Sequence, residues 1–77
     1  MNKLILREFN LEYVLYEYQP EGRGECGEVI YCFDDKMAQI VKRAGENSAW
    51  HDDKAVLKVE EFVDKKNLPM EFIQAWY

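Results

Sequence analysis

A strand, a glycine-rich loop and a second strand in the first half of the chain most strongly limit what it can fold into. Residues 11–18 are rich in aromatic and branched side chains, which are typical of β-strands. Residues 19–27 contain one proline and three glycines, and these residue types favour loops. Residues 28–33 again have the composition of a strand. We therefore expect a β-hairpin, in which the two strands pair around the loop.

The first of these strands has a competing interpretation as a helix, because Leu11, Val14, Leu15 and Tyr18 also recur at helical spacing. We favour the strand, because three tyrosines within six residues are poor helix formers. In a strand, successive side chains face opposite sides. Residues 11, 13, 15 and 17 would then share one face, and residues 12, 14, 16 and 18 the other. Residues 3–9 either extend this strand or form a separate one.

A short apolar stripe predicts a helix between Asp35 and Gly45. Its members recur at the i, i+3, i+4, i+7 spacing of one helix face, and they are Met37, Ile40, Val41 and Ala44. Asp34 or Asp35 could accept backbone N–H bonds at the start of this helix. Gly45 stands where a left-handed residue would end it.

A second apolar stripe predicts a longer helix that begins at Asp52 or Asp53. The side chains of this stripe are Ala55, Val56, Val59, Phe62 and Val63. Asn67 is a suitable left-handed end for the helix, and Pro69 prevents its continuation.

Residues 70–77 have the composition of a last strand, with Phe72 and Trp76 on one face. The expected order along the chain is therefore β-β-α-α-β. We predict one small α+β domain over residues 1–77, in which two helices pack on one face of a mostly antiparallel sheet.

Acidic side chains are concentrated in the first half of the chain. The 77 residues carry 15 acidic and 10 basic side chains, a formal charge of −5, while residues 8–35 hold eight acids and one base, a charge of −7. Binding to a phosphate backbone needs Lys and Arg, so we expect no nucleic-acid partner. The acidic segment could instead complement a basic partner. One alternative function is therefore an acidic inhibitor that mimics nucleic acid and binds a basic protein.

Cysteine content and hydropathy indicate the compartment. No run approaches the roughly 18 apolar residues that span a bilayer, and the start of the chain has no signal-peptide core. The two cysteines, Cys26 and Cys32, are too few for the disulfide framework of a small secreted protein and are not spaced as C-x-x-C. We expect a cytoplasmic protein with two free thiols and no membrane contact.

The loop sequence from Gly22 to Gly27 matches the G-x-G-x-x-G pattern of dinucleotide-binding proteins. In those proteins a helix follows the glycines and its N-terminus holds the pyrophosphate. Here a strand follows, and the neighbouring Glu21, Glu25 and Glu28 would repel phosphate. We therefore interpret the glycines as a hairpin loop and expect no cofactor.

His51, Asp52 and Asp53 resemble a set of metal ligands. Adjacent residues on a helix point about 100° apart, so the three do not converge on one ion. We expect helix capping and a favourable helix-dipole contact instead, with no metal and no catalytic residues. A small enzyme or metal-binding protein centred on His51 remains the other alternative.

The aromatic side chains of the predicted strands give the leading functional hypothesis. A sheet covered by helices buries one face, and exposed Tyr and Trp are suited to interfaces because an apolar ring carries a polar tip. We expect a small acidic protein-interaction or regulatory module that binds a protein partner, or a second copy as a homodimer, through a tyrosine-rich sheet face. The candidate surface comprises Glu12, Tyr16, Tyr18, Glu21, Trp76 and Tyr77.

Overall fold

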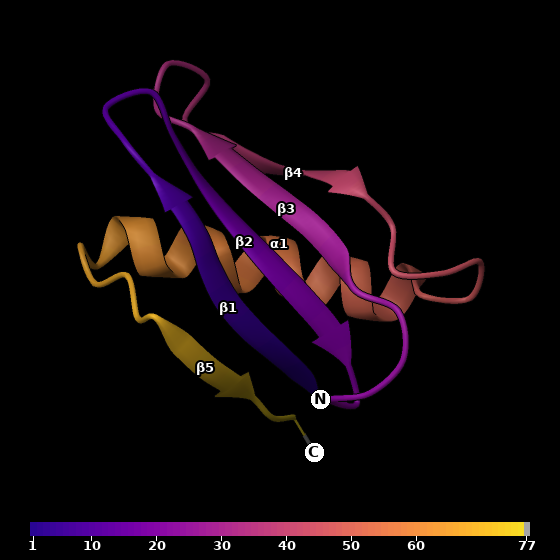
Figure 1. Cartoon of the computed structure of the whole chain (residues 1–77). Helices are drawn as coiled ribbons and strands as arrows, with labels where there is room; N and C mark the ends of the chain where they lie inside the picture. Colours follow the sequence, from indigo (N-terminus) through magenta and orange to yellow (C-terminus); the bar gives the residue numbers. More distant parts are fainter. Residues whose placement is uncertain (77) are drawn as a thin grey trace.

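A computed structural model describes residues 1–76, which form a five-stranded antiparallel sheet with one helix across one of its faces (Figure 1). The elements in chain order are β1 (Asn2–Phe9), β2 (Tyr13–Pro20), β3 (Gly27–Cys32), β4 (Met37–Lys42), α1 (Ala49–Asp64) and β5 (Glu71–Gln74). The strand order in the sheet is β4-β3-β2-β1-β5, so the chain returns after α1 to pair β5 with β1. Within the described residues, no helix is long and apolar enough to cross a membrane.

The predicted helix between Asp35 and Gly45 is wrong, because this segment forms β4. The order is β-β-β-β-α-β with one helix, in place of β-β-α-α-β with two. The apolar residues of β4 fit the spacing of a strand as well as that of a helix. In the strand, the side chains of Ala38 and Ile40 face α1, whereas Met37 lies half exposed on the opposite face. Pairing with β3 therefore prevails over the helical spacing in so short a segment.

The hairpin of the first half is confirmed. β2 and β3 pair antiparallel around the glycine-rich loop, with Tyr16 opposite Val29. Residues 3–9 belong to a separate strand, β1, which pairs with β2 and has a bulge between Leu6 and Glu8.

The longer helix is confirmed in place, but it begins earlier than predicted. Ser48, not Asp52 or Asp53, is the N-cap residue of α1, and its side chain bonds to the Gly45 backbone instead of capping the helix. Asp52 lies in the first turn, where a carboxylate interacts favourably with the helix dipole. The last strand, β5, is shorter than the predicted segment 70–77.

The core lies between α1 and the sheet face that bears the tyrosines of β2. The buried apolar side chains are Leu4, Val14, Tyr16, Tyr18, Val29, Tyr31, Ala38, Ala44, Ala55, Val59 and Phe62. The alternation predicted for β2 is confirmed, since its even-numbered residues share this face. The opposite face of the sheet is uncovered and carries ion pairs such as Arg7–Glu17 (3.1 Å).

Gly27 gives the Tyr18 ring its place in the core. Gly27 and Tyr18 are directly opposite each other in the β2–β3 pair. A Cβ atom on Gly27 would lie 2.3 Å from Cζ of Tyr18, which is far inside van der Waals contact. Because Gly27 has no side chain, the Tyr18 ring can lie over it within the core.

We predict that Gly27→Ala destabilises the fold by about 1–3 kcal/mol, because the methyl group must displace the Tyr18 ring in a filled core. Gly45→Ala is the matched control, since a Cβ there meets nothing within 4 Å. Urea denaturation of both variants measures the difference. Equal stabilities for the two variants would contradict this account of Gly27.

Candidate functional site

Tyr16 and Tyr18 of the predicted interaction surface are fully buried, at 0% exposure. The Tyr16 hydroxyl donates a hydrogen bond to the backbone oxygen of Pro69 (2.6 Å), and burial raises the pKa of Tyr16 to about 12. The Tyr18 hydroxyl donates to the carboxylate of Asp52. The prediction that Tyr16 and Tyr18 are exposed contact residues is therefore wrong, because α1 covers the face of the sheet on which they lie.

The remaining predicted surface residues do not form one surface. Glu12 is exposed in the turn between β1 and β2. Glu21 lies in the loop after β2, where its carboxylate accepts a hydrogen bond from the chain's N-terminal ammonium group (2.8 Å). Trp76 is half-buried, with its ring centroid 5.5 Å from that of His51. Tyr77 lies outside the described residues.

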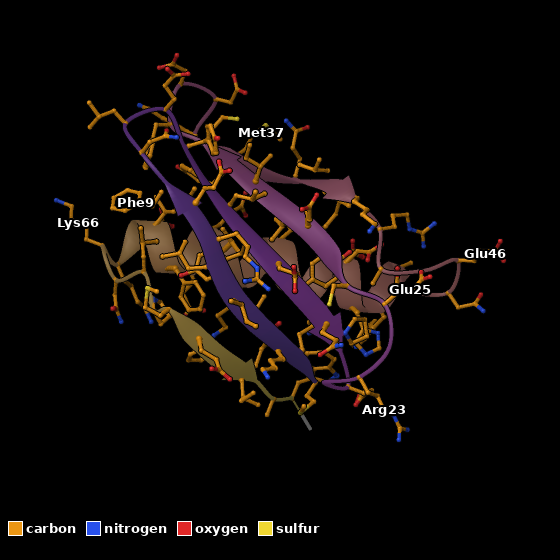
Figure 2. All side chains as sticks on the ribbon, viewed as in Figure 1. Phe9, Arg23, Glu25, Met37, Glu46 and Lys66 are labelled. Atoms are coloured by element: carbon orange, nitrogen blue, oxygen red, sulfur yellow. The ribbon has the colours of Figure 1, made fainter. Side chains whose placement is uncertain are left out.

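The acidic segment is likewise divided. Glu12, Asp34 and Asp35 lie in turns at one end of the sheet, whereas Glu21 and Glu25 lie in the loop at the other end. Figure 2 labels Glu25 in this loop. Several carboxylates of this segment are engaged within the chain: Glu8 with Tyr13, Glu17 with Arg7, and Glu21 with the N-terminal ammonium group. The acids therefore do not follow one row, as phosphates do along a nucleic-acid strand.

His51 lies on the first turn of α1 with its Nε2 atom 3.4 Å from Glu21. Among residues 1–76, no group of three or more His, Cys, Asp and Glu side chains is arranged to hold a metal ion. Both cysteines are free. Burial, followed by the neighbouring Glu17 carboxylate, raises the pKa of the Cys26 thiol, so this thiol is not activated as a nucleophile.

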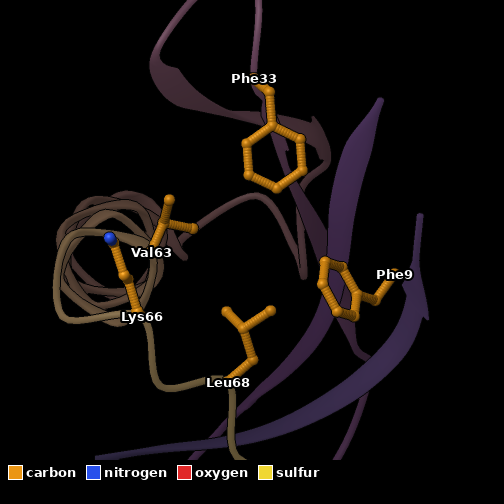
Figure 3. A pocket seen from close by; sticks show the side chains of 5 residues that line it. All are labelled: Phe9, Phe33, Val63, Lys66 and Leu68. Carbon is orange, nitrogen blue, oxygen red and sulfur yellow. The ribbon is translucent and has the colours of Figure 1, made fainter. Parts of the chain in front are cut away.

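An apolar cavity of about 330 Å³ opens at the end of the molecule where α1 finishes. Its lining comes from four segments: the end of β1, the residue after β3, the last turn of α1 and the chain that follows it. Figure 3 shows the five lining side chains around a shared space: Phe9, Phe33, Val63, Lys66 and Leu68. Of these five residues, Lys66 is the charged one.

The chain segment that follows α1 forms one wall of the cavity and is hydrogen-bonded to the sheet. Pro69 accepts the hydrogen bond from the Tyr16 hydroxyl, and Met70 accepts one from the backbone N–H of Leu6 (2.9 Å). Below it, the rings of Phe62 and Phe72 pack edge to face with their centroids 5.2 Å apart. The backbone of this wall is therefore bonded to the sheet at two points.

One of the lining side chains of the cavity is itself largely exposed. Phe9 lines it while 63% exposed, and Leu11, two residues later in the same turn, is 96% exposed. Met70, two residues after the lining residue Leu68, is 73% exposed. Phe9 therefore presents an exposed apolar ring at the cavity.

A second hollow, of about 250 Å³, lies at the opposite end beside the start of α1. Its lining is mixed in charge and includes Arg23, Glu25 and His51. Beneath it, the buried Asp52 carboxylate accepts hydrogen bonds from the Tyr18 hydroxyl and from Nε of Arg43 (2.9 Å). This polar cluster fixes the N-terminal end of α1 on the sheet.

Hydrogen bonds make the Asp52 carboxylate a stronger acid despite its burial. Burial alone would raise the pKa of Asp52, but bonds with Tyr18, Ser48 and Arg43 hold it below its usual value of 3.8. A folded-state pKa below the unfolded value stabilises the fold above that value, and the contribution is lost as the pH falls through the folded-state pKa.

The chain was compared with protein-family models, with curated proteins and with solved structures, and none of the three comparisons finds a match. The apolar cavity is the candidate site, because it combines an apolar lining, a wall hydrogen-bonded to the sheet and the exposed ring of Phe9.

We predict that Asp52→Asn lowers the stability at pH 7 by about 1–3 kcal/mol, because Tyr18 and Arg43 lose their charged acceptor. The difference from wild type is expected to be complete above about pH 5 and to shrink as the pH falls through the folded-state pKa of Asp52. Denaturant unfolding between pH 2 and pH 7 measures it, with the exposed neighbour Asp53→Asn as the control. A loss of stability at pH 7 that is equal in the two variants would be inconsistent with a special role for Asp52.

Proposed function

We propose that this protein is a small cytoplasmic interaction module that holds an apolar side chain of a protein partner in the cavity at the C-terminal end of α1. The observation that carries the proposal is the cavity of about 330 Å³ with its apolar lining. The tyrosine-rich face has no part in the proposal, because α1 covers it. The two free cysteines support a reducing compartment.

The size of the cavity suits one large side chain. An enclosed apolar cavity of about 150 Å³ takes up benzene, so a space of about twice that volume accommodates an indole ring or a branched aliphatic chain. Ligand sites for whole small molecules start at about 300 Å³, and this cavity lies at that lower limit. A single anchoring residue of a partner is therefore a better match than a cofactor.

The chemistry of the lining supports binding rather than catalysis. Of the five lining residues, four are apolar and the fifth is Lys66, so the lining has no paired nucleophile and base. Aromatic walls such as Phe9 and Phe33 favour an apolar anchor through area and ring geometry. The exposed ring of Phe9 would extend the contact with the partner beyond the cavity itself.

We predict that indole, used as a probe, binds this cavity with a dissociation constant on the order of 1 mM, as expected for a ligand of this size. Amide and methyl chemical shifts of Phe9, Phe33, Val63 and Leu68 should move together on titration. Val63→Phe should weaken the binding at least several-fold, because the larger ring fills the space.

Leu57→Phe is the matched control, because it adds a ring to an exposed position of the same helix that does not line the cavity. Indole shifts that are absent, or that survive Val63→Phe unchanged, would overturn the proposed site. Capture experiments then extend the test: a partner retained by wild type and by Leu57→Phe, but lost with Val63→Phe, would be bound through the cavity.

A further inference from the structure

The outer side of β4 is a second surface that the proposed site does not use. β4 is the last strand of the sheet at the end away from β5. An edge strand presents unpaired backbone N–H and C=O groups, which can pair with another strand. Its sequence, Met37–Lys42, contains no proline and has one charged residue, at its end. The pairing of β3 with β4 is irregular at the end of the strand, where Val41 is an extra residue before Lys42, and bulges and lysines oppose edge pairing there. The regularly paired part, residues 37–40, has neither a charge nor a proline.

The register identifies the groups that point outward. Ala38 is directly opposite Tyr31 and Ile40 is opposite Val29 in the β3–β4 pair. The backbone N–H of Ala38 donates to the Glu60 carboxylate of α1 (3.0 Å), so it points away from β3. Because hydrogen-bonding directions alternate along an antiparallel strand, the N–H and C=O of Ile40 also point outward.

Exposed apolar side chains flank these backbone groups. Met37 and Val41 of β4 are 50% and 58% exposed. α1 runs antiparallel to β4, since Glu60 contacts Ala38 near one end of the strand and Asp52 contacts Arg43 just beyond the other. Leu57, one turn before Glu60 and 61% exposed, therefore lies along the same edge. The edge thus combines free backbone groups with an apolar border.

We propose that the outer edge of β4 is a pairing surface for β4 of a second copy of this chain, and that Glu60 holds this surface closed by occupying the Ala38 N–H. A second copy matches the edge because its features are self-complementary. Antiparallel pairing about a two-fold axis at Gln39 sets Met37 opposite Val41 of the second copy on the uncovered face. Each copy then supplies both the donors and the acceptors of the new ladder.

Glu60 opposes this pairing in two ways. It occupies the N–H that an incoming strand would use, through a hydrogen bond to a charged acceptor. It also places a carboxylate where the incoming strand would exclude water, and a buried unpaired charge is costly. Among residues 1–76, Glu60 makes no ion pair that would compensate its burial. The carboxylate is therefore a local barrier against self-association.

The test is the self-association of Glu60→Ala, measured by sedimentation equilibrium. We expect its dimer dissociation constant to fall roughly ten-fold or more relative to wild type, the size of effect expected for loss of a charged hydrogen bond. Glu61→Ala is the matched control: it removes the same charge from the next helix position, where Glu61 bonds Lys58 and Lys65 and not the edge. Alanine favours helix, so both variants should fold.

A second substitution identifies the surface. Val41→Lys in the Glu60→Ala background should return the protein to wild-type association, because an edge lysine blocks strand pairing. In the Glu60→Ala dimer, the backbone N–H of Ile40 should exchange with solvent more slowly as the protein concentration rises. Association of Glu60→Ala equal to that of Glu61→Ala would overturn the proposal. So would a dimer that survives Val41→Lys with unchanged exchange at Ile40, because it would form through another surface.

Discussion

Two tyrosines of one strand attach both ends of the helical layer to the sheet, and most other features depend on this attachment. Tyr18 bonds Asp52 in the first turn of α1, and Tyr16 bonds Pro69 just after the helix. Both rings are buried, so each hydroxyl group must be hydrogen-bonded within the protein. Each bond holds its acceptor at a defined place relative to β2. These two bonds fix how α1 and the chain after it lie on the sheet. They therefore determine which parts of the sheet the helix covers and which parts stay open.

The open parts of the molecule are where binding is proposed. At one end the chain after α1 turns back toward β5, and the space between this turn and Phe9 remains as the apolar cavity. Along one side α1 comes close enough to β4 for Glu60 to reach the strand's backbone. The two surfaces have different chemistry: the cavity suits a side chain, and the edge suits a strand. Both result from covering a five-stranded sheet with a single helix.

Much of this architecture could be predicted from the sequence, and the failures have physical causes. The β2–β3 hairpin and the stripe of α1 were visible because composition and period agreed there. β4 was misassigned because Met37, Ile40 and Val41 fit a helical face as well as a strand, and pairing with β3 is a long-range effect. Tyr16 and Tyr18 were correctly predicted to share one face of β2, but that face was predicted to be exposed. The period of a strand does not say which of its two faces a helix covers. The cavity residue Phe9 ends β1 and Leu68 lies in the connection between α1 and β5, and no periodic pattern marks either position.

The return of β5 to β1 has a consequence for how the chain reaches this structure. Residues 2–5 pair with residues 71–74, so this part of the sheet closes a loop that contains nearly every other residue. The entropy of such a closure must be supplied before its hydrogen bonds form, whereas the β1–β4 meander needs only local turns. We therefore expect the β1–β4 meander to form before β5 pairs with β1. Until β5 pairs, β1 is itself an edge strand of the sheet.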